Sequence, residues 1–237
     1  MPESGQWFNL PGPEMDVSVS SRARLSRNLM GYLFPPLASK DQEEMASEEI
    51  LKAFQKLPGG FKIISLDGIS PLERRILMER NLISQELSAS PNKVVAISED
   101  EKLSAMINEE DHLRLQILKA GCQLSACAKQ IDHIDNMIDQ KVEYAFSPCY
   151  GYLTACPTNL GTGIRVSVML HLPALKMTGQ IEKFFNAARD MSLAVRGLFG
   201  EGTEAASDLY QLSNQVTLGV CESDIVRQFE GTIIPEV

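Results

Sequence analysis

The run Asn-Glu-Glu-Asp-His-Leu-Arg, residues 108–114, places three carboxylates and an arginine inside an otherwise apolar stretch. Met106 and Ile107 precede it, and Leu115 and Ile117 follow it. We expect residues 103–118 to be mostly strand. Charges on a half-buried strand need partners, because desolvating an unpaired charge is costly. The run therefore indicates either a solvated charged surface or a site that holds a cation beside a polyanion.

A second run, Cys-Pro-Thr-Asn-Leu-Gly-Thr-Gly-Ile-Arg at 156–165, suits the same task. A lone cysteine such as Cys156 is more often a buried structural thiol. The functional alternative is open, because the Thr158 hydroxyl and a nearby cation could favour the thiolate, although no His/Asp pairing marks an acyl-transfer nucleophile. The turn at 161–163 lacks the lysine spacing of a P-loop, and no Gly-x-Gly-x-x-Gly occurs. The chain therefore has neither a P-loop nor the glycine-rich loop of protein Ser/Thr kinases.

Arginines also recur near both ends of the chain. Arg22 and Arg24 are two residues apart, so on a strand both guanidinium groups lie on one face. A planar, permanently charged guanidinium suits phosphate, although an Arg-x-Arg strand taken alone is more often a solvated face. The run Arg-Gly-Leu-Phe-Gly-Glu at 196–201 would by itself be an ordinary helix-to-strand connection. Together the four runs share one chemistry, in which arginines grip a polyanion and carboxylates hold a cation such as guanidinium.

Composition limits the class of protein. The 237 residues suffice for one large domain or two small ones, and 44% hydrophobic and 22% charged residues are ordinary for a globular protein. A net charge of −9 argues against nucleic acid or an anionic membrane as partner, but not against ATP, which would depend on local arginines. Five cysteines, without Cys-x-x-Cys spacing or an export signal, favour reduced thiols in the cytoplasm. With only three histidines no zinc pattern can be drawn, and no apolar run reaches the length of a membrane span.

Hydrophobic periodicity predicts an α+β fold with a large antiparallel sheet, because helices and strands are interspersed without regular βαβ alternation. Ser70 is expected to cap a helix that has Pro71 at its first position. The predicted helices are 41–57, 71–84, 122–140 and 178–194, and the predicted strands, besides 103–118, are 61–66, 93–97, 144–154, 163–170 and 210–218.

In this order and spacing, the four runs closely resemble the catalytic domain of the ATP:guanidino phosphotransferases, or phosphagen kinases. The resemblance extends from about Val17 to about Leu218. The amino-acid sequence at 151–154 and 167–173 is most similar to that of the bacterial protein-arginine kinases. The resemblance implies a large antiparallel β-sheet flanked by helices, the guanidino kinase or glutamine-synthetase-like catalytic fold. It also implies ATP-dependent phosphoryl transfer to a guanidino group, with Mg²⁺ held mainly through the nucleotide phosphates and no metal site built by the protein.

The resemblance assigns a role to each matching residue. Glu110 and Glu201 would hold the guanidinium, with Glu110 as base, and Cys156 would contact it electrostatically. Glu109 would help to order the magnesium shell through water. The residues expected to bind the nucleotide are Ser20, Ser21, Arg22, Arg24, Arg114, Arg165, Val166, Ser167, Val168, Met169, Arg196, Gly197 and Gly200.

The expected organisation is an N-terminal extension at 1–16 and a catalytic domain at 17–237. Neither the N-terminal small-substrate domain of creatine and arginine kinases nor a C-terminal phosphoarginine-binding domain is expected, since the string at 189–194 lacks the second arginine of Arg-Asp-x-x-Arg-Ala. The leading hypothesis is a protein-arginine kinase acting on proteins with exposed arginine, in the cytoplasm. A kinase for a small free guanidine, and a non-catalytic nucleotide- or arginine-binding module that regulates a partner, remain alternatives. A regulatory protein partner and the oligomeric state are left open.

Overall fold

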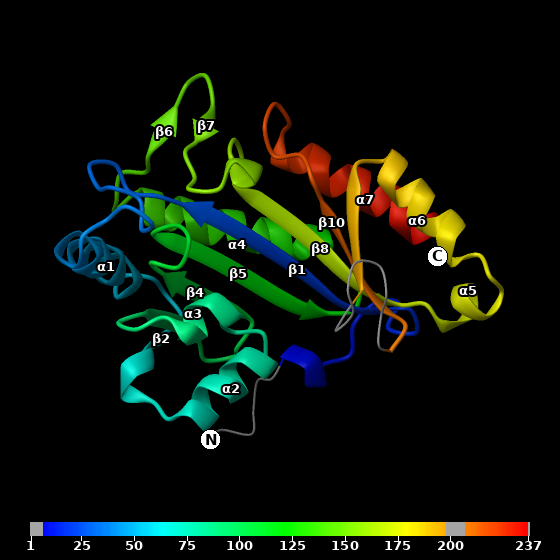
Figure 1. The fold of residues 1–237 in the computed structure, drawn as a ribbon, viewed down its shortest axis with the longest axis horizontal. Helices are drawn as coiled ribbons and strands as arrows, with labels where there is room; N and C mark the ends of the chain where they lie inside the picture. The colour runs from blue at the N-terminus through cyan, green and yellow to red at the C-terminus, as the bar shows by residue number, and fades with distance from the viewer. Residues whose placement is uncertain (1–6, 198–206, 237) are drawn as a thin grey trace.

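A long antiparallel sheet of eight strands is the frame of the molecule (Figure 1). The computed structural model describes residues 7–197 and 207–236, and within these the strand order is β2-β3-β4-β5-β1-β8-β10-β9. The strands are β1 Ser18–Arg27, β2 Phe61–Ser65, β3 Val94–Ser98, β4 Leu103–Ile107, β5 Leu113–Ala120, β8 Ile164–His171, β9 Leu193–Gly197 and β10 Leu209–Asn214. The predicted fold class is confirmed.

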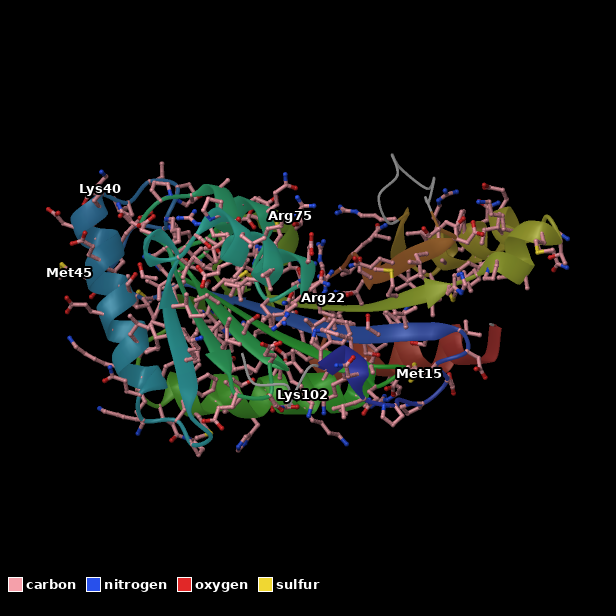
Figure 2. All side chains as sticks on the ribbon, turned by 90° about the horizontal axis from the view of Figure 1, so that it is seen from below. Met15, Arg22, Lys40, Met45, Arg75 and Lys102 are labelled. Carbon is pink, nitrogen blue, oxygen red and sulfur yellow. The ribbon has the colours of Figure 1, made fainter. Side chains whose placement is uncertain are left out.

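The main core lies between the sheet and the helices on one of its faces. Helices α4 (Leu124–Asp139) and α7 (Glu222–Glu236) lie together on this face (Figures 1 and 2). Helices α1 (Lys40–Phe54) and α6 (Ile181–Asp190) contribute to the same core. Successive side chains of β1 point to opposite faces of the sheet, and Ala23 and Leu25 point into this core. The arginines between and beside them are left on the opposite face.

A second, smaller core covers the opposite face at the β2–β4 end of the sheet. Helices α2 (Pro71–Glu79) and α3 (Gln85–Ala89) lie on this side. Strand β3 is buried on both faces, with Ala96 in the main core and Val95 and Ile97 in the second one. The second core leaves the middle of this face, over β5, β1 and β8, to polar side chains.

The sequence patterns predicted where most helices begin, but they were wrong about where several helices end. Ser70 forms a capping box with Glu73 in front of Pro71, as predicted. The predicted helix to Ser84 instead ends at Glu79, because Asn81 adopts a left-handed conformation (φ 57°) and Ser84 caps the separate helix α3. Among the described residues the sequence analysis also missed α7 and the short helix α5 (Pro173–Met177).

Two further predictions are wrong. The expected helix 178–194 begins only at Ile181, after Gly179 (φ 68°), and ends at Asp190, so that its expected C-terminal end is part of strand β9. The expected strand 144–154 is instead a separate two-stranded hairpin, β6 (Phe146–Ser147) and β7 (Gly151–Tyr152). For β9, pairing with β10 overrode the local helical pattern, whereas residues 146–152 fold back on themselves into a local hairpin.

A buried arginine ties the hairpin and the glycine-rich turn to the core. Arg27, only 2% exposed, pairs with Asp135 of α4 at 2.7 Å and donates to the Thr162 carbonyl at 2.8 Å. Its guanidinium carbon lies 3.4 Å from the ring centre of Tyr152. The charge is thus paired, hydrogen-bonded and stacked, which offsets the cost of burying it. Within the described residues no helix is long and apolar enough to cross a membrane.

Candidate active site

A small cleft of about 110 Å³ opens on the polar face of the sheet. Strands β1, β5 and β8 supply its arginines, the β4–β5 turn supplies Glu110, and the segment after β7 supplies Cys156. Its lining residues are Arg24, Ser26, Glu110, Arg114, Cys156, Thr158, Asn159, Gly163 and Arg165. Residues from three of the four sequence runs therefore meet in one cavity.

Strand register accounts for the grouping of the arginines. Arg24 stands directly opposite Arg165 on β8, and Ser26 stands opposite Arg114 on β5. Arg22 stands opposite Ser167 and donates from Nε to its hydroxyl at 3.3 Å. Because facing residues of adjacent strands project to the same side of a sheet, three strands distant in sequence build one basic surface.

The arginines of the basic surface are partly buried and repel one another. Burial, together with the positive charges of Arg114 and Arg165, lowers the pKa of Arg22 from its ordinary value to about 10. Burial and the neighbouring arginines also hold the pKa of Arg24 well below its ordinary value, and burial and Arg196 lower the pKa of Arg165. The buried Nε atoms of Arg24 and Arg165 have no hydrogen-bond partner among the described residues. Converging cations with unused donors fit a multiply charged anion.

Glu109 and Glu110 approach the two ends of one guanidinium. The Glu109 carboxylate, 3% exposed, pairs with Arg114 Nη1, while Glu110 pairs with Nη2 at 2.7 Å and is 42% exposed. Glu109 is therefore part of the buried support of Arg114. Glu110 keeps access to the cleft, where its carboxylate can accept hydrogen bonds from a cationic ligand.

Cys156 faces Glu110 across the cleft from a short 3-10 turn, Pro157–Asn159. Its Sγ lies 3.0 Å from the Thr158 hydroxyl, and its carbonyl accepts a 2.8 Å hydrogen bond from Thr154. Thr158 thus contacts the half-buried thiol and Thr154 holds the backbone of Cys156. No histidine or aspartate is among the lining residues of the cleft that could make the thiol an acyl-transfer nucleophile.

Asp111 joins the segments that carry Glu110 and Cys156, and the sequence analysis assigned it no role of its own. Its fully buried carboxylate accepts from the Ala155 backbone at 2.7 Å and from the Asn28 side chain at 2.6 Å through the same oxygen. Ala155 is next to Cys156 in the chain, and Asp111 is next to Glu110. One carboxylate therefore fixes the separation of the two groups. In the sequence Asp111 stands between Glu110 and His112 within the charged run, and this position indicated no partner for its carboxylate.

We expect Asp111→Asn to reduce kcat by about 10- to 100-fold and to leave the Kd for ATP nearly unchanged. The amide keeps the shape but loses two charge-assisted hydrogen bonds, and a displacement of about 1 Å between catalytic groups can cost that much rate. Steady-state kinetics and ATP titration would separate the two effects. A parallel loss of ATP affinity would show that Asp111 supports the whole domain rather than the Glu110–Cys156 distance.

The buried side chain of His112 links the β4–β5 turn to the segment that follows β1. Its Nδ1 accepts from the Leu29 backbone at 3.1 Å, and its Nε2 lies 3.1 Å from the Leu33 carbonyl, to which it donates. Both contacts require the neutral ring with the proton on Nε2. Burial accordingly lowers the pKa of His112 below 6.5.

This burial predicts a pH dependence of stability. Above pH 6.5 the ring is neutral in the folded and unfolded chains, so its contribution is complete. As the pH falls below 6.5 the unfolded chain takes up a proton before the folded one does. The free energy of unfolding should then fall by up to about 1.4 kcal/mol per pH unit until the lowered pKa is reached. Urea unfolding from pH 8 to 5 should give a shallower decline for His112→Gln than for wild type; equal slopes would contradict the prediction.

Three of the expected nucleotide-binding residues project away from the cleft. Ser21 is buried toward α4, where its hydroxyl donates to the Gly121 carbonyl and accepts from the Gln123 backbone. Val166 and Val168 belong to the main core. Strand alternation is the physical reason, because in each case the neighbours Arg22, Arg165 and Ser167 take the polar face.

The remaining expected residues form a second row on the same polar face. Arg196 on β9 stands opposite Gln211, Gln211 opposite Met169, and Met169 opposite Ser20. Arg196 is exposed, and Gly197 ends its strand. Gly200 and Glu201 lie outside the described residues, so their expected roles rest on the sequence alone.

Comparison with known proteins places this geometry in a family. Residues 42–235 match the family described as ATP:guanido phosphotransferase, C-terminal catalytic domain. A protein-arginine kinase of Pelotomaculum thermopropionicum is 45% identical over 226 residues, which is 93% of this chain and 64% of that protein. The protein-arginine kinase of Bacillus subtilis is 45% identical over 229 residues, 95% of this chain and 63% of that protein. The chain thus spans about two thirds of the length of these curated relatives.

Solved structures of two guanidino kinases have a fold similar to that of this chain. A taurocyamine kinase from Schistosoma mansoni with bound transition state analog components has a TM-score of 0.85 and 26% identity, covering 100% of this chain and 34% of that one. Lombricine kinase has a TM-score of 0.83 and 25% identity, covering 98% and 71%. The fold, the converging arginines and the sequence match lead to one conclusion: the chain belongs to the ATP:guanido phosphotransferase catalytic-domain family.

Proposed function

We propose that the chain transfers the γ-phosphoryl group of ATP to the guanidino group of arginine side chains in proteins, giving phosphoarginine and ADP. The observation that carries this proposal is the single cleft in which Arg24, Arg114 and Arg165 meet Glu110 and Cys156. The first three suit a polyphosphate, and the other two suit a guanidinium beside it. The names of the relatives at 40–45% identity support arginine in proteins as the acceptor.

The arginines would bind the phosphates and neutralise the charge of the transition state. Phosphoryl transfer depends mainly on positioning and on stabilising charge at the equatorial oxygens. Arg22, Arg24, Arg114 and Arg165 offer guanidinium donors from three adjacent strands, and Arg196 lies on the same face farther along the sheet. Because these positions are set by backbone pairing, the cations need little reorganisation when ATP binds.

Glu110 would orient the acceptor and take its proton. A guanidinium is a poor nucleophile, since its lone pair is delocalised and it is protonated. In the proposed step a guanidino nitrogen forms the N–P bond, the bond from the γ-phosphorus to the β,γ-bridging oxygen breaks, and the proton passes to the Glu110 carboxylate. Glu201 is proposed, from the sequence, as the second carboxylate, and Cys156 as a contact that fixes the guanidinium plane without attacking it.

Mg²⁺ would enter with ATP. When bound it supplies charge neutralisation at the phosphate oxygens. The part of the chain that the structure describes contains no group of three or more His, Cys, Asp or Glu side chains that could hold a metal ion. From the family match we propose that the phosphates hold Mg²⁺, with Glu109 contributing at most through water.

A free guanidine compound is the second candidate acceptor. The likeness to taurocyamine kinase and lombricine kinase favours it, since both names refer to kinases of single guanidine compounds. The higher identity to the protein-arginine kinases favours protein arginine. We also propose a reducing compartment such as the cytoplasm, since all five cysteines are free thiols.

The test is incubation with Mg-ATP and an arginine-containing protein such as casein, read by mass spectrometry under non-acidic conditions. Non-acidic handling is needed because the N–P bond is acid-labile. Phosphoarginine in the wild-type reaction and none with Glu110→Gln would support the proposal. Turnover of free guanidines alone would favour the second candidate, and ATP binding without any turnover would favour a non-catalytic regulatory module.

A further inference from the structure

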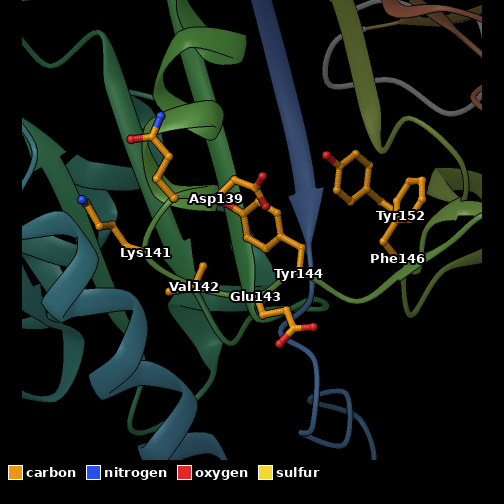
Figure 3. Close-up of a pocket in the computed structure, with 8 residues that line it drawn as sticks. Asp139, Lys141, Val142, Glu143, Tyr144, Phe146 and Tyr152 are labelled. Carbon is orange, nitrogen blue, oxygen red and sulfur yellow. The ribbon is translucent and has the colours of Figure 1, made fainter.

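A second cavity, of about 470 Å³, lies beside the β6–β7 hairpin (Figure 3). It is formed by the C-terminal end of α4, the loop that follows it, and the hairpin. Its lining residues are Asp139, Gln140, Lys141, Val142, Glu143, Tyr144, Phe146 and Tyr152. None of these residues lines the catalytic cleft, and nothing in the proposed reaction uses them.

Three aromatic rings form one side of this cavity. Tyr152 packs edge-to-face against Phe146, with ring centres 5.2 Å apart, and against Tyr144, with ring centres 6.0 Å apart. Phe146 is 50% exposed, so its ring is accessible from solvent. Arg27 already stacks on the inner side of Tyr152, so these rings do accept a guanidinium. Perpendicular rings of this kind present the π-faces that attract cations.

The other side of the cavity carries uncompensated negative charge. Asp139 and Glu143 are exposed, and their carboxylates make no ion pair or hydrogen bond with any residue in the described ranges. Lys141 is the one cation among the lining residues, and Figure 3 shows its side chain directed away from the rings. Burial raises the pKa of Tyr152, the Arg27 cation lowers it, and the negative charges of Asp135 and Asp139 raise it.

Backbone contacts connect the hairpin that lines this cavity with the loop that lines the catalytic cleft. Tyr152 donates from its backbone to the Gly161 carbonyl at 2.8 Å, and a side chain on Gly151 would collide with Gly161, whose carbonyl oxygen would lie 2.6 Å from the new Cβ. Gly161 lies between Asn159 and Gly163, which line the cleft. The cavity and the cleft are therefore linked through two backbone segments in direct contact, 151–152 and 159–163.

We infer that this cavity binds a second cationic side chain, lysine or arginine, of the protein that carries the target arginine. The inference rests on the proposed function, since it assigns the site to the same substrate. Aromatic faces supply the attraction for the cation, and Asp139 and Glu143 supply charge complementarity without a partner of their own. The chain should therefore prefer target arginines that have a basic neighbour at a defined spacing.

Short peptides with a single arginine in a Gly/Ser context would test this. One lysine is moved from four residues before the arginine to four residues after it, and a matched series carries glutamine instead. With wild-type protein, lysine at one or two spacings should lower KM on the order of five- to tenfold and leave kcat unchanged, as expected for an exposed cation–π contact plus ion pairs. Asp139→Asn/Glu143→Gln should abolish this difference. The control Glu182→Gln/Asp190→Asn removes equal charge from exposed positions on α6 and should retain it.

A binding measurement keeps the result separate from catalysis. A lysine peptide without arginine cannot be phosphorylated on a guanidino group, so its effect on the ring NMR signals of Phe146 and Tyr152 reports the cavity alone. Shifts in wild type that disappear in the double variant would support the site even if no phosphoarginine is formed, in which case only the proposed function fails. No shifts, shifts that persist in the double variant, or equal KM for lysine and glutamine peptides would overturn the inference.

Discussion

Glu110→Gln should lower kcat for phosphoarginine formation by about 10²- to 10⁴-fold and leave the Kd for ATP within about twofold of wild type. The range is that of a lost general base. Glutamine can still accept the hydrogen bond that Arg114 donates to Glu110 at 2.7 Å, so the arginines keep their positions. What the amide cannot do is take up the guanidino proton. Single-turnover kinetics with separately measured ATP binding would distinguish chemistry from affinity.

Glu99→Gln is the matched control, because Glu99 is exposed and outside the cleft. It removes the same charge and should retain wild-type turnover. Near wild-type kcat for Glu110→Gln would remove this residue from the mechanism. A large rise in the Kd for ATP would instead assign Glu110 to the support of Arg114.

Arg24→Met should make the free protein more stable while it destroys nucleotide binding. Arg24 lies half-buried among Arg22, Arg114 and Arg165, and its pKa is held low by burial and by their charges. Methionine is of similar length and removes the repulsion, which should raise the Tm without ATP by about 2–6 °C for a gain of 1–2 kcal/mol. Losing the charged donors should raise the Kd for ATP by about 100-fold, since hydrogen bonds to charged groups contribute about 1.5–3 kcal/mol.

Thermal unfolding with and without Mg-ATP measures both effects at once. Wild-type protein should be stabilised by about 2.7 kcal/mol when ATP is at 100 times its Kd, and Arg24→Met should show almost none of this shift at the same concentration. Arg75→Met, on the exposed surface of α2, controls for the loss of one arginine. A free variant less stable than wild type, with an unchanged ATP response, would mean that Arg24 is a structural residue.

Elements with a complete local signal were predictable. Apolar residues at helical spacing mark α1 and α4, and the capping box marks the start of α2. Strand β9 (Leu193–Gly197) could not be predicted, because it follows α6 after only two residues. Its extended conformation depends on pairing with β10, which comes later in the chain. The β6–β7 hairpin has strand-like residues but does not join the main sheet; it pairs within itself and, through Tyr152, bridges to Gly161, where Gly151 packs closely.

The site was predictable as a set of residue types and only partly as a set of positions. Arg22 and Arg24 share a face because they are two residues apart on one strand. The same rule, applied to Ser21, Val166 and Val168, would have excluded these side chains once the polar face was known. Asp111 and Asn28 could not have been paired from the sequence, since 83 residues separate them.

The amino-acid sequence alone determined the chemistry of this protein: which groups are available, which family they match, and which neighbours along a strand share a face. These are properties of residue type and of short-range geometry. Only the tertiary structure decided that Glu110 and Cys156, 46 residues apart, face one cleft and that Arg165 stands opposite Arg24. The reason is physical, because strand register and buried polar contacts such as those of Asp111 form between segments distant in the chain, and no local periodicity encodes them.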